Sequence, residues 1–171
     1  MTCEQCGSRI PLPRRADARF CSGACRQRAY RARHGVVPAR MRDERRWVRA
    51  AGKRPVQPGG APASSTSPAT WSAFADVQSG AGDGFGVMLG GGLACWDLDD
   101  CFVGGRLAGW ARDALVGVVP IYAERSVSGR GLHVFVEAPE GPGMRRGGVE
   151  FYSRARFIRV TGDRVVLEGV L

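Results

Sequence analysis

The chain has 171 residues and a mass of 18.3 kDa, which suits one domain of ordinary size with a small appendage and excludes two full catalytic domains. Hydrophobic residues make up 44% of it, enough to form a core, and no apolar run approaches the roughly 20 residues of a membrane span. Its first residues lack the order of a signal peptide, basic and then apolar, so we expect a cytoplasmic protein with no membrane partner.

The basic residues are concentrated in the first third of the chain. Residues 1–54 hold 15 of the 25 basic residues but only four of the 16 acidic ones, so this segment carries a net charge of +11 and the rest carries −2. Such an asymmetry is typical of a segment that binds a polyanion, and nucleic acid is the commonest polyanion in a cytoplasm. The alternative is a solvated basic face in an arginine-favouring genome, since 24 of the 25 basic residues are arginine.

Four of the six cysteines lie within the first 25 residues, as two close pairs separated by a loop of 14 residues. Each pair can span one edge of a tetrahedron, so the spacing predicts a four-thiolate zinc site made by Cys3, Cys6, Cys21 and Cys25. Disulfides are the alternative, but cytosolic thiols stay reduced. A segment this short has too little apolar surface to fold alone, so we predict a zinc module over residues 1–35 that depends on its metal.

The second cysteine pair opens a predicted helix that continues to Arg33. This pattern resembles the small treble-clef or ribbon-like zinc modules that are common at the ends of DNA-handling proteins. Contacts from its cations to phosphates would be sensitive to salt and independent of sequence. The residues predicted to bind DNA are Arg26, Arg28, Arg31 and Arg33.

The main domain is expected over residues 36–171. A basic connecting helix is predicted over residues 36–50, where few side chains are large and apolar. The Pro- and Gly-rich stretch at residues 52–70 has the composition of a linker or a long extended loop. A short capped helix with an apolar stripe is predicted over residues 71–77.

Two apolar runs at residues 84–89 and 93–97, joined by three glycines, predict a β-hairpin. The second run ends in Asp97-Leu98-Asp99, so both carboxylates project from the same face of the strand. Their mutual repulsion favours a hard divalent cation, Mg²⁺ or Mn²⁺, as a cofactor. The alternative is that Asp99 or Asp100 caps the next element, which has the pattern of a helix over residues 104–116.

A strand at residues 120–124, a loop at 125–131 and a strand at 132–136 follow. The Ser/Gly/Arg loop can offer backbone N–H groups, hydroxyls and a guanidinium to a phosphate chain. In the strand after it, His133 lies on the face opposite the inward-facing residues. A lone histidine is more often structural, but its place directly after this loop favours a nucleotide ligand.

Two further strands complete the domain. Glu150 and Tyr152 share one face of a predicted strand, and residues 156–167 predict a terminal hairpin that turns at Gly162-Asp163.

Three motifs follow one another along the chain. They are the Asp-x-Asp that ends an apolar strand, then Glu-x-Ser-x-Ser-Gly-x-Gly-Leu-His, and then Glu-x-Tyr followed by Arg-Phe-x-x-x-Thr-Gly. In combination they resemble the primase-polymerase domain of phages and mobile elements, a branch of the archaeo-eukaryotic primase superfamily. The resemblance covers roughly residues 47–167, and it favours an extended segment on the catalytic domain over a linker at residues 52–70. It implies an α+β fold, with a mostly antiparallel sheet and flanking helices.

The resemblance also implies site residues. The catalytic acids that bind Mg²⁺ or Mn²⁺ match Asp97 and Asp99, and the third acidic position matches Glu150. The positions that bind the nucleotide match His133, Ser128, Arg130, Arg145 and Arg146. The implied activity is that of a DNA primase/polymerase, which performs template-directed nucleotidyl transfer on single-stranded DNA with nucleoside triphosphates.

Many relatives continue into a helicase domain, whereas this chain stops at Leu171, so we expect a separate helicase as partner. The alternative function is a non-catalytic, zinc-containing DNA-binding accessory protein of replication on a primase-like scaffold. A zinc-finger transcription regulator is a third possibility, which accounts only for the first 50 residues.

Overall fold

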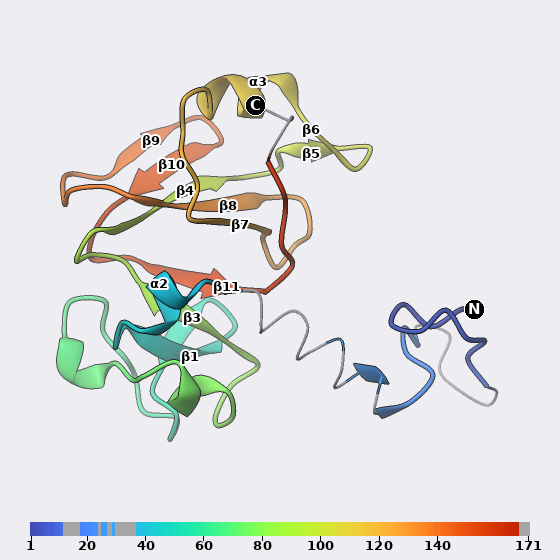
Figure 1. Ribbon diagram of the computed structural model, residues 1–171. Coiled ribbons are helices and arrows are strands. Elements are labelled where there is room, and N and C mark those ends of the chain that lie inside the picture. The colour runs from blue at the N-terminus through green and yellow to red at the C-terminus, as the bar shows by residue number, and fades with distance from the viewer. Residues whose placement is uncertain (12–17, 24, 27–28, 30–36, 168–171) are drawn as a thin grey trace. The chain divides into compact units, whose positions relative to one another are not determined.

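The computed structural model describes residues 1–11, 18–23, 25–26, 29 and 37–167. The chain divides into two compact units, Met1–Val36 and Val37–Leu171. The second unit holds a four-stranded and a five-stranded sheet, and the strands of its described residues all pair antiparallel (Figure 1). The described part of the chain is therefore mostly antiparallel sheet with few helices, which confirms the α+β class.

The four-stranded sheet has the strand order β11-β3-β1-β2. Its strands are β1 (Trp47–Ala51), β2 (Arg54–Val56), β3 (Gly84–Met88) and β11 (Phe157–Val160). Trp47, Phe74 and Phe85 pack edge to face, with ring centroids 4.7–5.8 Å apart. The Pro- and Gly-rich stretch lies along this sheet, since Ala63 N–H donates to the carbonyl of Pro55. This confirms the expectation of an extended segment on the domain.

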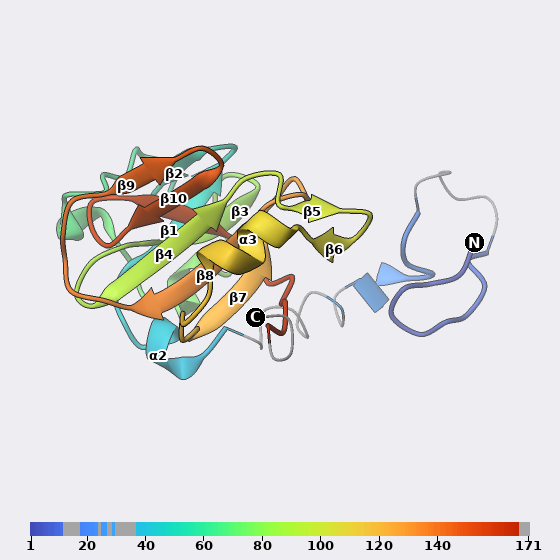
Figure 2. The same cartoon turned by 90° about the horizontal axis from the view of Figure 1, so that it is seen from above.

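The five-stranded sheet has the strand order β7-β8-β4-β10-β9. Its strands are β7 (Tyr122–Arg125), β8 (Leu132–Glu137), β4 (Leu93–Leu98), β10 (Val149–Tyr152) and β9 (Met144–Arg146). Leu98, Leu132 and Val134 of this sheet belong to a buried apolar cluster that Ala111 of α3 (Gly109–Ala114) joins. Figures 1 and 2 show α3 on this face, with the four-stranded sheet on the other side.

The remaining elements are short. They are α2 (Ala39–Arg42), the 3₁₀ turns η1 (Pro68–Thr70) and η2 (Ala75–Val77), and the paired strands β5 (Phe102–Val103) and β6 (Arg106–Leu107). Among the described residues, no helix has the length and apolar character needed to cross a membrane.

The predicted helix over residues 36–50 is wrong. Only Ala39–Arg42 is helical in its described part, and Trp47–Ala51 forms β1. The first four residues of this strand are buried, so both of its faces are covered and its pattern shows no alternation. Arg49 is only 8% exposed because its guanidinium donates to backbone carbonyls of the loop that includes Val77 and Ala81.

Both predicted hairpins are also wrong. β3 and β4 lie in different sheets, because Gly90, Gly91 and Gly92 adopt positive φ angles and carry the chain from one sheet to the other. The C-terminal segment does not fold back on β11. Instead, β11 pairs with β3, and Val165 N–H beyond it donates to the carbonyl of Ala123 in β7.

Two predicted helices are shorter than expected. The segment 104–116 begins with β6 and is helical only over α3, and residues 71–77 contain the single 3₁₀ turn η2. The predicted strands around His133 and Glu150 are confirmed as β8 and β10.

Candidate active site

A row of polar side chains crosses the five-stranded sheet, with one residue from each strand. Glu124 of β7 lies opposite His133 of β8, which lies opposite Asp97 of β4. On the other side of β4, Asp97 lies opposite Glu150 of β10, which lies opposite Arg145 of β9. Directly opposed residues of antiparallel strands share a face, so all five project away from the apolar face that packs on α3.

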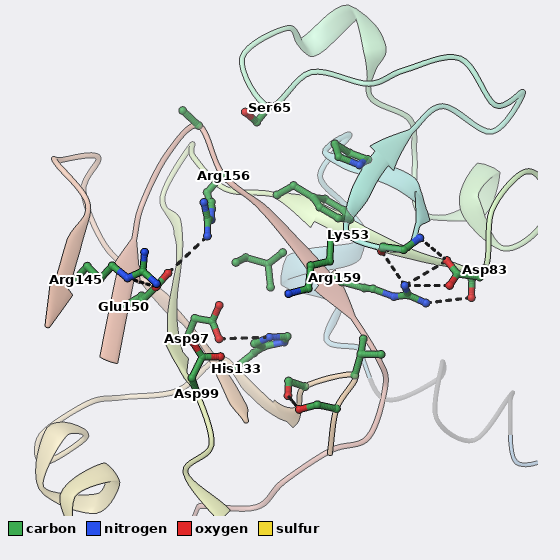
Figure 3. Close-up of a pocket in the computed structure, with 18 residues that line it drawn as sticks. Lys53, Ser65, Asp83, Asp97, Asp99, His133, Arg145, Glu150, Arg156 and Arg159 are labelled. Carbon is green, nitrogen blue, oxygen red and sulfur yellow. Dashed lines mark hydrogen bonds and ion pairs between the residues drawn. The ribbon is translucent and has the colours of Figure 1, made fainter. Parts of the chain in front are cut away.

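His133 is held between two carboxylates. Its Nδ1 lies 3.3 Å from Glu124 Oε1, its Nε2 lies 3.6 Å from Asp97 Oδ1, and its side chain is 9% exposed (Figure 3). Burial alone would lower the pKa of His133, but Glu124, Asp97 and Asp99 outweigh it and the net pKa is raised. The structure therefore favours an imidazolium with one N–H toward Glu124 and the other toward Asp97.

Glu124 is a functional candidate that sequence reasoning missed. It is fully buried, and its carboxylate accepts hydrogen bonds from the backbone N–H groups of Thr161 and Gly162 at 2.9–3.1 Å. Thr161 directly follows β11, so this carboxylate joins the end of the four-stranded sheet to His133. A signal was present, since Glu124 is the first residue of the motif that ends in His133.

Glu150 is 5% exposed and has partners at both carboxylate oxygens. Oε1 lies 2.6 Å from Arg145 Nε, and Oε2 accepts a hydrogen bond of 2.8 Å from the hydroxyl of Tyr152. Arg156 lies 3.6 Å from the same oxygen. Glu150 is thus neutralised by two arginines, whereas among the described residues Asp97 forms an ion pair with His133 alone.

These residues open into a pocket of about 940 Å³. One wall carries Asp97, Asp99, His133 and Glu150 of the five-stranded sheet. The facing wall comes from the turn between β1 and β2 and from the segment around β11, and it carries the cations Lys53, Arg156 and Arg159 (Figure 3). A cavity of this size suits a nucleotide, and its acidic and basic groups suit a metal ion and a phosphate chain.

Comparison with known proteins agrees with this geometry. The family model for the N-terminal domain of bifunctional DNA primase/polymerases (Prim-Pol) matches residues 26–169. The chain belongs to the Prim-Pol family. This membership confirms the resemblance of its motifs and gives the chain a primase/polymerase-family role in DNA replication, with DNA and nucleotides as the substrates of the family. No curated protein matches the chain.

Prim-Pol proteins generally use divalent metal ions, and Asp97 and Asp99 fit one. Burial, ahead of the repulsion from Asp99 and Glu150, raises the pKa of Asp97, so a cation beside it would offset an electrostatic cost. Glu150 fits less directly, because both of its oxygens are engaged. The three carboxylates do not gather as tightly as the four cysteines, which form the one compact group of three or more metal ligands among the described residues.

The structure separates the predicted nucleotide-binding residues of this Prim-Pol domain into two sets. His133, Ser128 and Arg145 line the pocket. Arg130 and Arg146 are not among its lining residues: Arg130 forms an exposed ion pair of 2.6 Å with Asp100, and Arg146 projects opposite to Arg145.

Sequence reasoning assigned no role to several other pocket residues. Lys53 and Arg156 stand in segments that resemble the family, so a signal was present for both. Ser65 and Asp83 carried no signal, because they reach the pocket only through the tertiary fold.

The four cysteines gather in the first unit, outside the Prim-Pol match. Their sulfur atoms all lie within 4.8 Å of one another, with Cys6 and Cys21 3.6 Å apart and Cys21 and Cys25 3.5 Å apart. Four thiolates about 2.3 Å from a zinc ion would be about 3.8 Å apart, so the cluster fits a tetrahedral metal ion. A hydrogen bond from the backbone N–H of Cys21 lowers the pKa of Cys3 to about 6, which favours the thiolate.

The predicted DNA-binding arginines lie mostly beyond the structural description. Arg26 is described, and its N–H donates to the carbonyl of Ser22 in a helical turn. Arg28, Arg31 and Arg33 lie outside the described residues.

Proposed function

We propose that this chain is a DNA primase/polymerase that performs template-directed nucleotidyl transfer on single-stranded DNA in the replication of a phage or mobile element. The observation that carries the proposal is the arrangement of the pocket. Asp97, Asp99 and His133 lie on one wall, and a set of cations lies on the facing wall. Nucleotidyl transfer needs carboxylates that hold a metal ion and cations that contact the phosphates, because negative charge develops on a phosphate chain as it reacts.

In this proposal Asp97 and Asp99 hold Mg²⁺ or Mn²⁺. The ion would lower the pKa of a 3′-hydroxyl and neutralise charge at the α-phosphate. Glu124 holds Nδ1 of His133, so that the Nε2–H can donate to a phosphate oxygen. Ser128 lies in the adjoining loop and faces the same ligand.

Arg145 and Glu150 act as a pair. The Arg145 side chain is 73% exposed, so it is free to turn from Glu150 to the triphosphate. Its departure leaves Glu150 available as the third acidic ligand. Binding of a nucleotide would thus complete the acidic site.

The four cysteines would hold a structural Zn²⁺, and the module would hold the single-stranded template through Arg26, Arg28, Arg31 and Arg33. A separate helicase would open the duplex. The zinc proposal predicts one bound zinc per chain, which Cys3→Ser/Cys6→Ser releases together with part of the affinity for template. An unchanged zinc content in that variant would contradict the ligand set.

The activity is tested by primer-independent synthesis on single-stranded DNA, with labelled nucleotides and Mg²⁺ or Mn²⁺. We expect product from the wild-type chain and none from Asp97→Ala/Asp99→Ala. Asp113→Ala is the matched control, because Asp113 is an exposed acid of α3 that does not line the pocket. No product from the wild type, or equal product from the double variant, would contradict the proposal and leave the non-catalytic DNA-binding role.

A further inference from the structure

The turn between β1 and β2 aims one cation into the pocket. Ala51 pairs with Arg54, so Gly52 and Lys53 form a two-residue turn. The turn is fixed from both sides, because Gly52 N–H donates to Asp83 Oδ1 at 3.1 Å and the Gly52 carbonyl accepts from Arg159 at 2.8 Å. Gly52 also has a φ of +60°, which favours glycine. Figure 3 shows the Lys53 side chain pointing from this turn toward Asp97 and His133.

Lys53 is also the pocket cation without a partner. Arg145 and Arg156 are paired with Glu150, and Arg159 is paired with Asp83 at 3.2 Å. Lys53 has no hydrogen bond or ion pair with any other residue that the structure describes. An anionic ligand can therefore engage Lys53 without breaking an existing ion pair, whereas each arginine must first give up a carboxylate.

The choice of residue is informative. Lys53 is the single lysine of a chain that carries 24 arginines, and Arg54 stands next to it. If the position required only a positive charge and phosphate contacts, an arginine with its five N–H donors would serve better. A lysine offers one property that an arginine lacks, because an ammonium group can give up a proton and return to the neutral amine.

We propose that Lys53 binds the phosphate chain of the incoming nucleotide and donates a proton to the leaving pyrophosphate, an inference that rests on the proposed function. In this step the 3′-oxygen forms a bond to the α-phosphorus and loses its proton to water. The bond from the α-phosphorus to the bridging oxygen breaks, and that oxygen keeps the electron pair and takes a proton from Lys53 Nζ. The neutral amine then regains a proton from solvent.

The test compares Lys53→Arg and Lys53→Ala with the wild-type full chain. It measures the nucleotide dissociation constant and the single-turnover rate of primer extension. We expect Lys53→Ala to weaken nucleotide binding and to lower the rate by about 100-fold, the lower end of the range for general acids. Lys53→Arg should restore binding but leave the rate about 100-fold low. Arg54→Ala is the control, since Arg54 directly follows the turn but does not line the pocket.

A second measurement isolates the proton transfer. Nucleotides with a β,γ-CF₂ group have a more acidic leaving group than those with β,γ-CH₂. The rate of Lys53→Arg should depend more steeply on this acidity than the rate of the wild type, because its leaving group departs unprotonated. If both rates depend equally on the acidity of the leaving group, or if Lys53→Arg reacts at the wild-type rate, the inference about Lys53 is overturned and the proposed function is not. A wild-type chain without metal-dependent product overturns the proposed function as well.

Discussion

The two walls of the pocket are built on different principles. In the five-stranded sheet, strand register fixes the order Glu124, His133, Asp97, Glu150 and Arg145, and most of these side chains are buried. The facing wall presents long cations from a turn and from the segment around β11. In the first wall, pairing between strands fixes where the carboxylates and the histidine lie, whereas the cations of the second wall stand on long side chains that can adapt to a ligand.

The largest effect should come from the rigid wall. We expect Asp97→Asn to reduce nucleotidyl transfer by roughly 1,000-fold, because loss of a metal ligand removes several kcal/mol of stabilisation of the transition state. The steady-state rate of nucleotide incorporation measures this loss. The corresponding change Glu137→Gln, at an exposed acid at the end of β8, should leave the rate unchanged. A rate within tenfold of wild type would exclude Asp97 as a metal ligand.

The same variant should also gain stability without metal. Burial raises the pKa of Asp97 in the folded state, so the unfolded chain ionises this carboxyl at lower pH than the folded chain does. The folded state therefore loses stability as the pH rises from the unfolded pKa through the folded pKa, and the loss persists at neutral pH. Asp97→Asn removes that loss, so its midpoint of thermal unfolding at pH 7 in chelator should exceed that of the wild type. A lower midpoint would contradict this assignment.

Variants of Glu124 test whether the buried carboxylate stabilises the wall formed by the five-stranded sheet. Glu124→Ala leaves the N–H groups of Thr161 and Gly162 without their acceptor, which should lower the free energy of unfolding by about 3 kcal/mol. Glu124→Gln keeps one acceptor oxygen and should cost less. Urea denaturation at pH 7 measures both. Equal stability of the two variants and the wild type would show that this carboxylate does not join the sheets.

The smallest effects should come from the outward-facing arginines. Arg145→Ala should raise the nucleotide KM by about tenfold, the value of one charge-assisted contact. Arg146→Ala is its matched partner one residue away, and Arg130→Ala tests the exposed pair with Asp100. Both should change the KM by less than about twofold, because neither residue lines the pocket. If Arg146→Ala were as impaired as Arg145→Ala, the triphosphate would have to bind on the other face of β9.

Alternation along strands made much of the candidate site predictable. Asp97, His133 and Glu150 were assigned to polar faces because every second residue beside them is apolar, and the structure brings the three together. The same rule, applied strictly, argues against Arg146, since two consecutive residues of a strand project to opposite faces. The assignment of these three residues to one face was therefore possible from the local sequence.

The connections between strands, and the way in which the two walls of the pocket meet, were not local information. Three consecutive glycines suit a hairpin as well as a crossing between sheets, so the separation of β3 from β4 depends on pairings with strands far along the chain. Glu124 belongs to a motif of the sequence, but its buried contacts were not predictable, because its backbone partners follow 37 and 38 residues later. A basic segment that forms a strand instead of a helix, as Trp47–Ala51 does, owes this to burial on both faces.

The central place of β4 in its sheet has a consequence for biosynthesis. Its neighbours β8 and β10 begin at Leu132 and Val149, so β4 leaves the ribosome with neither hydrogen-bonding edge satisfied and waits for some 50 further residues. Pairings between such distant segments form slowly, and an unpaired apolar strand is prone to aggregation in the meantime. Asp97 thus lies on a strand that stays unpaired during much of synthesis, and the row of polar residues across the sheet is complete only when β10 has been made.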